Sequence, residues 1–443
     1  MHNMRLSSTI GIILTTLIVV WAWGVAMSSS SAASLPWAVY DHSLYLCGFL
    51  SISLMSLTML LAIRPAWLET PLGGLDQMYR LHKWTGILAV IFAAAHWLIE
   101  MGDDLVKAIF GRSGRLHEAE FSGFVEMVRD AAEDIGEWAI YLLLAMLALT
   151  LLKYFPYKFW RYLHRMIPVL YLLLAFHAVW LAPPVWWQQP TGLLMALLLS
   201  GGIAASLLSL SGRVGRKRRC SGRISVINRL SPDITEVQCD LGTNWPGHRA
   251  GQFALVTFNS LEGSHPFSLA SANQGDGRVT FLIKALGDYT RDLSRKIHAG
   301  QAVSVEGPYG RFDVTDSRHG ARQVWVAGGI GITPFLAGLE EQQKYPERAS
   351  MTELHYCTAN AATDPTVARL HELCAALPQL TLFIHDSHKG EKLSADQLLV
   401  SQPASHALDI WFCGPKGLAR SLKEGLKGKC DSLRFHQEAF ELR

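Results

Sequence analysis

The N-terminal half of the chain is dominated by long apolar segments. Six of them approach or reach the ~20 mostly apolar residues that a transmembrane helix needs. They are Ile10–Met27, Leu44–Ile63, Leu81–Ile99, Trp138–Leu152, Tyr162–Leu181 and Thr191–Leu210. A soluble domain does not bury six such stretches in succession. We therefore expect residues 1–212 to form an all-α bundle of six helices embedded in the lipid bilayer.

The first apolar segment has two interpretations. Arg5 precedes it and the small residues Ser31–Ala33 follow it, which is the arrangement of a signal peptide with its cleavage site. The apolar run is longer than the core of a usual signal peptide, so a retained helix is favoured. The other five helices have the same topology in both cases.

The hydrophobic pattern changes after Gly222. Five short runs of β-forming residues, separated by turn signals, predict an antiparallel β-barrel or sandwich. These runs are Arg223–Asn228, Ile234–Asp240, Phe253–Phe258, Arg278–Ala285 and Ala302–Glu306. From Gln323 onward strands alternate with helices, which is typical of a parallel α/β nucleotide-binding domain. The predicted elements are the strands Val324–Ala327, Thr352–Cys357, Leu380–His385 and Asp409–Cys413 and the helices Val367–Leu377 and Lys416–Leu426. We expect the barrel over residues 213–318 and the α/β domain over residues 319–443.

Basic residues gather in three connections of the membrane half. They are Arg64, Arg80, Lys153, Lys158, Arg161, Arg165, Arg213 and Arg216–Arg219. The connections 28–40 and 182–190 contain none, and the loop 100–137 is mainly acidic. Its stretch Glu118–Glu137 is interpreted as a solvated helix, and an amphipathic helix lying on the outer membrane surface is the alternative. Because cytoplasmic loops are enriched in Lys and Arg, we place the basic connections and the C-terminal half in the cytoplasm. We expect an integral protein of a bacterial inner membrane.

The remaining composition narrows the compartment and the partners. A net charge of +3 is too small to indicate a nucleic-acid partner. The seven cysteines form no CxxC pair and no metal-ligand spacing, which suits a reducing compartment around the C-terminal half, where six of them lie.

Two of the predicted membrane helices each carry a pair of histidines. Ionisable residues inside a membrane are costly and are candidates for function. His82 and His96 lie ~20 Å apart along the third helix, as do His164 and His177 along the fifth. Both helices run outward from the cytoplasm, so His82 levels with His164 and His96 with His177. Two histidines at equal depth on neighbouring helices can ligate one haem iron from both sides, and packing or proton relay is the alternative.

The spacing within the second pair does not fit a straight helix. The 14-residue step from His82 to His96 nearly restores the helical face, whereas the 13-residue step from His164 to His177 misses it by well over a quarter turn. Pro168 lies between the latter two residues, and its ring removes the hydrogen bond that the carbonyl of His164 would accept. We expect a kink there that re-aims one histidine.

Four local motifs of the C-terminal half suit a flavin and a nucleotide. His265-Pro266-Phe267-Ser268 offers an aromatic ring to cover an isoalloxazine face and a hydroxyl for its N5 edge. Backbone N–H groups at a helix start can hold phosphate, which suits both Gly287-Asp-Tyr289-Thr290 and the glycine-rich turn Gly328-Gly329-Ile-Gly331-Ile-Thr333-Pro334. Cys413-Gly414-Pro415 ends the last predicted strand, where α/β sheets bind ligands.

With these motifs in this order, the chain resembles the ferric reductase and NADPH oxidase family, and its C-terminal half resembles ferredoxin–NADP reductases. Members carry two histidine pairs at this spacing, an HPF[ST]xxS motif that ends here in Ser271, the GGxGxTP turn and the CGP motif. The resemblance implies FAD in the barrel, NADPH or NADH in the α/β domain, and two b-type haems on the histidine pairs. Hydride would pass from nicotinamide to flavin, and electrons would then pass to the inner and the outer haem.

The resemblance also indicates candidate catalytic residues, namely Ser268, Cys413 and Phe440. Phe440 corresponds to a C-terminal aromatic that covers the flavin in many members, and its alternative role is packing in a strand. Two departures limit what carries over. Glu100 stands where oxidases commonly have a histidine, and Tyr356–Asn360 offers no arginine for the 2′-phosphate of NADPH, for which Lys389 and Arg420 are substitutes.

The final electron acceptor has three candidates. A ferric chelate is favoured, and acidic residues at 100, 103 and 104 would attract cationic iron. The alternatives are oxygen, which would make the protein a superoxide-producing oxidase, and a quinone or a periplasmic protein partner.

Overall fold

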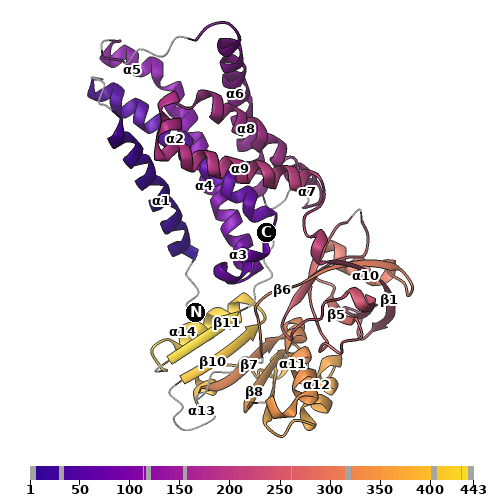
Figure 1. Cartoon of the computed structure of the whole chain (residues 1–443). Helices are drawn as coiled ribbons and strands as arrows, with labels where there is room; N and C mark the ends of the chain where they lie inside the picture. The colour runs from indigo at the N-terminus through magenta and orange to yellow at the C-terminus, as the bar shows by residue number, and fades with distance from the viewer. Residues whose placement is uncertain are drawn as a thin grey trace. The chain divides into compact units, whose positions relative to one another are not determined.

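The computed structural model describes residues 6–28, 34–112, 114–115, 121–152, 157–260, 262–314, 321–348, 350–400, 407–430 and 432–437. Two compact units divide the chain, Met1–Gly215 and Arg216–Arg443 (Figure 1).

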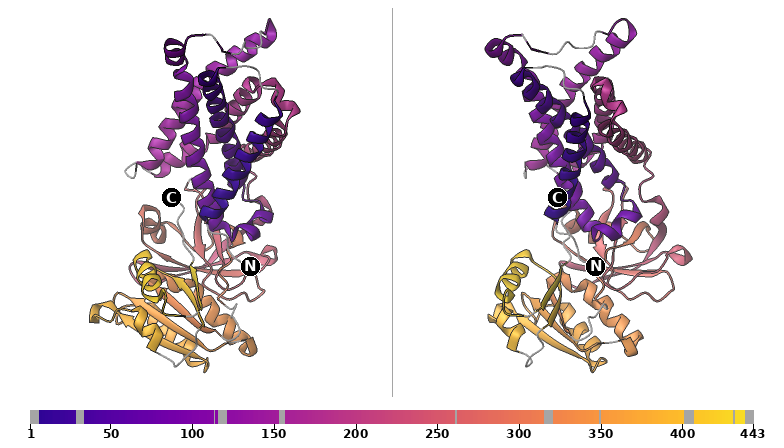
Figure 2. Two further views of the ribbon diagram at one scale, coloured as in Figure 1. Left: turned by 90° about the vertical axis from the view of Figure 1, so that its left-hand side faces the viewer. Right: turned by 60° about the vertical axis from the view of Figure 1, so that its left-hand side comes forward.

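The first unit is a bundle of apolar helices (Figure 2). Its long helices are α1 (Leu6–Met27), α2 (Leu35–Ala62), α4 (Leu75–Met101), α6 (Phe124–Leu151), α8 (Ile167–Leu181) and α9 (Pro190–Leu210). The short ones are α3 (Ala66–Leu72), α5 (Asp103–Phe110), α7 (Tyr157–His164) and the 3-10 turn η1 (Pro184–Gln188). Among the described residues, five spans are long and apolar enough to cross a membrane, namely α1, α2, α4, α9 and Phe159–Leu181 of α7 and α8. The prediction of a transmembrane helical domain is confirmed.

Helix α6 differs from the prediction in its length. The sequence suggested a membrane span at Trp138–Leu152 after a separate solvated helix, but both belong to one helix that starts at Phe124. Ala132, in the charged N-terminal part, is completely buried, and the Arg129 guanidinium donates a hydrogen bond of 2.6 Å to the carbonyl of Trp180 in α8. The charged part of α6 therefore packs against another helix of the bundle.

The second unit begins with a six-stranded antiparallel sheet in the order β4-β3-β6-β1-β2-β5. Its strands are β1 (Arg219–Arg229), β2 (Ile234–Asp240), β3 (Phe253–Thr257), β4 (His265–Ser268), β5 (Arg278–Lys284) and β6 (Ala302–Tyr309). A bridge between Leu269 and Phe281 links the chain after β4 to β5 and nearly closes the sheet into a barrel. Helix α10 (Asp288–Lys296) follows β5, and the predicted barrel is confirmed.

A parallel five-stranded sheet in the order β11-β10-β7-β8-β9 follows. Its strands are β7 (Arg322–Gly328), β8 (Thr352–Thr358), β9 (Leu380–Asp386), β10 (Ala407–Cys413) and β11 (Ser432–Gln437). The helices are α11 (Thr333–Lys344), α12 (Pro365–Ala375), α13 (Ala395–Val400) and α14 (Lys416–Leu426). Strand β7 is central and buried from Gln323 to Gly328, as the apolar run of a parallel strand covered on both faces requires.

The barrel and the parallel sheet share one hydrophobic core. Phe312, which follows β6, packs edge to face on Phe335 of α11 and on Trp411 of β10, with ring centres 5.8 and 5.0 Å apart. Glu340 and Glu341 of α11 accept hydrogen bonds from backbone N–H groups of the barrel loops at 2.9 and 3.1 Å. The two sheets of this unit are therefore held together by both apolar and polar contacts.

Candidate functional site

The four membrane histidines lie in two pairs. His82 of α4 faces His164 at the end of α7, with ring centres 6.2 Å apart and planes at 77°. His96 of α4 faces His177 of α8, with ring centres 6.4 Å apart and planes at 84°. Each pair joins helices that are distant in sequence, at two levels of the bundle.

Three of these histidines have a defined tautomer. The Nδ1 atom of His82 lies 2.9 Å from the carbonyl oxygen of Thr58, and the Nδ1 atom of His96 lies 2.9 Å from the carbonyl oxygen of Leu44. The Nδ1 atom of His177 lies 2.7 Å from the carbonyl of Ala132. A carbonyl only accepts, so each Nδ1 carries a proton, and in the neutral imidazole the Nε2 atom keeps its lone pair. This is the arrangement of a metal-binding histidine whose second nitrogen is held by the protein.

His164 is oriented by stacking. Its ring lies on the indole of Trp160, with ring centres 4.7 Å apart and planes at 21°. The Trp160 Nε1–H donates a hydrogen bond of 2.9 Å to the Thr150 hydroxyl, which anchors α7 to the end of α6. Trp160 was not predicted as a site residue, although an aromatic residue one turn before a membrane histidine is a usable signal in the sequence.

The helix that carries His164 and His177 is interrupted between them. Helix α7 ends at His164, a turn covers Arg165 and Met166, and α8 begins with Pro168 in its first turn. Proline has no N–H to donate to the carbonyl of His164, which explains why the helix stops there. The break allows the two histidines to face α4 despite a 13-residue step that an unbroken helix would rotate apart.

The histidine pairs fit a ligand that brings most of its own metal coordination. Among the described residues, no three His, Cys, Asp or Glu side chains gather closely enough to hold a bare metal ion. An iron bound at ~2 Å from one nitrogen of each imidazole places the two ring centres roughly 6 Å apart. The observed separations of 6.2 and 6.4 Å agree with this value. Haem, whose macrocycle supplies the other four ligands, therefore fits both pairs.

The fold brings together the barrel motifs His265–Ser268 and Gly287–Thr290. The imidazole of His265 in β4 stacks on the phenol ring of Tyr289 in α10, with ring centres 3.8 Å apart and planes at 10°. Pro266 lies opposite Leu255 and Ser268 opposite Phe253 in the neighbouring strand β3. Phe267 is partly buried and packs on the barrel core. The stacked pair, rather than Phe267, is thus the prominent aromatic feature of this region.

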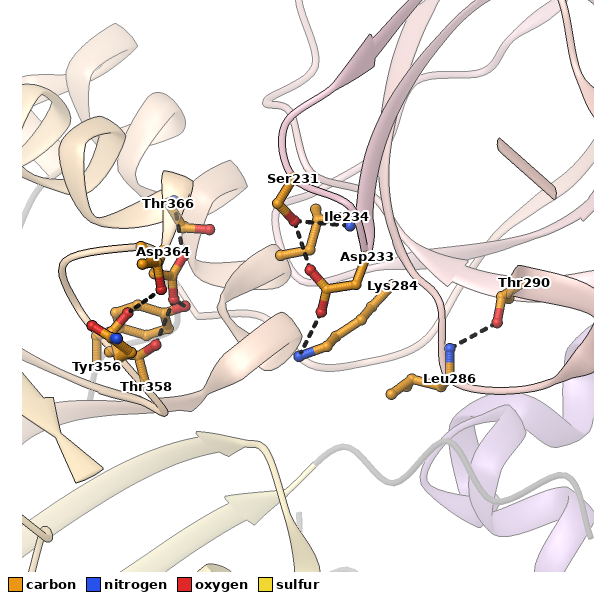
Figure 3. Close-up of polar contacts among 12 residues, drawn as sticks. Ser231, Asp233, Ile234, Lys284, Leu286, Thr290, Tyr356, Thr358, Asp364 and Thr366 are labelled. Carbon is orange, nitrogen blue, oxygen red and sulfur yellow. Dashed lines mark hydrogen bonds and ion pairs between the residues drawn. The ribbon is translucent and has the colours of Figure 1, made fainter. Parts of the chain in front are cut away.

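Two hydroxyl groups of these motifs make bonds within the fold. Ser271 Oγ accepts a hydrogen bond of 3.2 Å from the backbone N–H of Thr280. Thr290 Oγ1 accepts 3.0 Å hydrogen bonds from the N–H groups of Leu286 and Gly287 and so caps the start of α10 (Figure 3). A phosphate at this helix start would therefore meet the backbone N–H groups of the following residues.

The glycine-rich turn and the CGP motif touch one another at the carboxyl ends of β7 and β10. A methyl group on Gly331 would lie 2.2 Å from the carbonyl oxygen of Cys413, and one on Gly328 would lie 2.5 Å from Cδ of Pro415. Gly329 has a φ of +55°, and Gly414 lies beside Gly328. The Thr333 hydroxyl donates a hydrogen bond to the carbonyl of Ile330, and Pro334 lies in the first turn of α11. Only glycines allow this close approach, which leaves backbone N–H groups at a helix start for phosphate.

Two acidic residues near this edge support loops. Asp364 accepts hydrogen bonds from the Tyr356 and Thr358 hydroxyls and from the N–H of Thr366 (Figure 3). Burial would raise the pKa of this carboxyl, but the hydrogen bonds from Thr358 and Tyr356 hold it below its usual range. Asp386 accepts from the N–H groups at 361 and 388. Both carboxylates thus fix the loops that follow β8 and β9. Phe440 lies outside the described residues.

Two family models match this chain, one in each of its two units. The family model described as ferric reductase like transmembrane component matches residues 47–175, and the FAD-binding domain model matches residues 222–313. The carnitine monooxygenase reductase subunit of Escherichia coli is 30% identical over 211 residues, which are 45% of this chain and 62% of that protein. The heme-dependent oxidative N-demethylase beta subunit of Ectopseudomonas mendocina is 30% identical over 226 residues, 49% of this chain and 68% of that protein. The respiratory burst oxidase homolog protein E of Arabidopsis thaliana is 27% identical over 213 residues, 41% of this chain and 21% of that protein.

The fold and the matched models define an integral membrane oxidoreductase with an FAD- and NAD(P)H-binding reductase domain. The two matched models and the similarity to the respiratory burst oxidase homolog fit the ferric reductase and NADPH oxidase family. The chain spans 62% of the length of the Escherichia coli relative and 21% of that of the Arabidopsis relative.

Proposed function

We propose that this protein takes electrons from cytoplasmic NADPH or NADH and delivers them, through FAD and two b-type haems, to a ferric chelate on the other side of the membrane. The observation that carries the proposal is the geometry of the two histidine pairs. Both have the ring separation of two ligands on one iron, and three of the four rings present a lone pair on Nε2. Two such pairs at different levels of the bundle would hold two redox centres for electron transfer.

The haems would supply one-electron transfer, and their saturated coordination by two histidines would leave no iron position for oxygen. The inner haem would be held by His82 and His164, and the outer by His96 and His177. The carbonyls of Thr58, Leu44 and Ala132 and the indole of Trp160 hold the rings in place, which limits reorganisation during electron transfer.

In the reductase domain, FAD supplies the conversion between two-electron and one-electron chemistry. We infer that the His265–Tyr289 stack and Ser268 border the flavin and that the start of α10 binds its pyrophosphate. The Gly328–Pro334 turn would bind the nucleotide phosphates, with the Cys413–Pro415 segment beside the nicotinamide. Phe440 would cover the flavin until the nicotinamide displaces it.

A ferric chelate remains the proposed acceptor because the transmembrane half matches the ferric reductase model. Asp103 and Asp104 form ion pairs with Lys107, and Asp103 also lies 3.6 Å from a nitrogen of Arg115, so these carboxylates present little net negative charge to cationic iron. Oxygen, a quinone and a periplasmic protein are the other outcomes of the test.

The test uses the purified full-length protein under anaerobic conditions. Added NADH or NADPH should bleach the flavin absorbance and then produce the spectrum of reduced b-type haem, and rates with ferric chelate, oxygen and quinone are compared in one preparation. His177→Ala should retain flavin reduction and lose transfer to outside acceptors, whereas the exposed His42→Ala serves as control and should behave as the wild type. A preparation without haem, or undiminished outside reduction by His177→Ala, would overturn the proposal.

A further inference from the structure

The two carbonyl groups that hold the outer histidines, His96 and His177, share a sequence feature. Four residues after Leu44, which binds His96, stands Gly48 in the same helix α2. Four residues after Ala132, which binds His177, stands Gly136 in α6. The outer pair is thus bounded on two sides by a carbonyl followed one turn later by a glycine.

Helix geometry gives this spacing a physical meaning. The Cα–Cβ bonds of a helix tilt toward its N-terminus, so a side chain covers the surface over the preceding turn. A side chain at position i+4 therefore lies over the carbonyl of residue i. An imidazole can donate to that carbonyl from outside the helix only where position i+4 is small.

The distances show how strictly each position is constrained. A methyl group on Gly136 would lie 2.4 Å from both Cε1 and Nδ1 of His177, closer than any real contact. A methyl group on Gly48 would lie 3.2 Å from the same two atoms of His96, which is tight but nearer to van der Waals contact. The inner site provides a natural comparison, since the carbonyl of Thr58 binds His82 although Ala62 stands four residues later.

We propose that Gly136 and, less strictly, Gly48 are positioning residues that allow the outer histidines to donate to helix carbonyls and thereby aim Nε2 at the metal. Gly136 has the larger role, because its added methyl group must push the His177 ring out of place. The inner site tolerates a methyl group at the equivalent position, so Gly48→Ala should disturb the outer site only slightly. This inference rests on the proposed haem ligation.

The experiment compares Gly136→Ala, Gly48→Ala and Gly11→Ala in the full-length protein. Gly11 is the matched control, because it lies in the apolar helix α1 and an added methyl group there meets nothing within 4 Å. Haem per chain is measured from the absorbance of the pyridine complex, and each haem is followed by reductive titration and by the low-temperature electron paramagnetic resonance spectrum. His177→Ala and His82→Ala identify the outer and the inner signal.

Gly136→Ala should lose the outer haem signal, or shift its potential and resonance, while the inner signal stays unchanged. Gly48→Ala should cause a smaller shift of the outer signal alone, and Gly11→Ala should match the wild type. If Gly136→Ala does not accumulate as folded protein, Gly48→Ala serves as the test of the proposal. A shift of potential or resonance that is confined to the outer haem signal supports the proposal, and the absence of any shift overturns it. Unchanged spectra in Gly136→Ala also overturn it. A wild-type protein without haem would instead refute the proposed function.

Discussion

Buried and partly buried polar side chains form a cluster on one face of the parallel sheet. Arg322 of β7 makes a two-fold ion pair with Glu353 of β8, and the Nδ1 atom of His355 lies 3.0 Å from the Nε2 atom of His385 in β9. His355 also stacks on Phe383, with ring centres 4.7 Å apart.

This cluster predicts a pH dependence of stability. Burial and the neighbouring His355 lower the pKa of His385 to about 4, against a partial opposing effect of Glu391. The unfolded chain takes up a proton near the ordinary histidine pKa of ~6.5, so the folded state loses stability as the pH falls from there toward 4. Glu353 stays ionised over this range, because hydrogen bonds with His355 and Arg322 hold its pKa at about 2 although burial would raise it.

Thermal unfolding followed by tryptophan fluorescence should therefore show a midpoint several degrees lower at pH 5 than at pH 7. His385→Gln should reduce this difference, whereas His371→Gln, at an exposed position on α12, should leave it unchanged. An equal pH effect in all three proteins would show that His385 does not cause it.

At the scale of elements, the start of α12 depends on one carboxylate. Asp364 caps the helix by accepting from the N–H of Thr366, and it is also the acceptor for the buried Tyr356 hydroxyl at 2.6 Å. Asp364→Ala should lower the free energy of unfolding by about 2 kcal/mol, through the lost cap and the unsatisfied phenol. Asp364→Asn keeps one acceptor oxygen, which can retain the cap on the Thr366 N–H, and it should cost less, as denaturant unfolding of the two variants would show. Equal losses would argue against the double role.

The break between α7 and α8 leads to a second prediction at this scale. Pro168→Ala restores an N–H that can bond to the carbonyl of His164 and extend α7 into α8. The continuous helix would rotate His164 away from His82, so the inner haem signal should weaken. Pro190→Ala, at the start of α9, is the control, because that proline begins a helix without any of the four histidines. Equal inner signals in both variants would contradict this role of Pro168.

These elements also show what the sequence can and cannot predict. Periodicity placed β2 and α14 at their observed bounds, since both have clear apolar patterns between turn signals. Periodicity missed β4, because this strand is short and contains a proline. It also predicted two helices where α6 is one, because the burial of the charged half of α6 depends on contact with α8. The histidines were selectable as costly ionisable residues in apolar helices. Gly48 and Gly136 were not, because a glycine acquires a role only through what approaches it.

At the scale of the whole molecule, the basic connections predict sidedness. In sealed membrane vesicles with the reductase domain outward, added NADH or NADPH should be oxidised and a ferric chelate enclosed inside should be reduced. Vesicles of the opposite orientation should do neither until detergent opens them. Oxidation of nucleotide by both orientations before detergent treatment would refute the assigned orientation.

The core shared by the barrel and the parallel sheet has a consequence for biosynthesis. The barrel is translated before β7 and α11. Phe312 and Ala270 of the barrel region therefore emerge from the ribosome before Trp325 and Phe335, which belong to the same hydrophobic core. During that interval the nascent barrel presents apolar surface to solvent. Completion of the C-terminal sheet is what removes this surface, and a chain cut short after the barrel would be a substrate for chaperones and proteases.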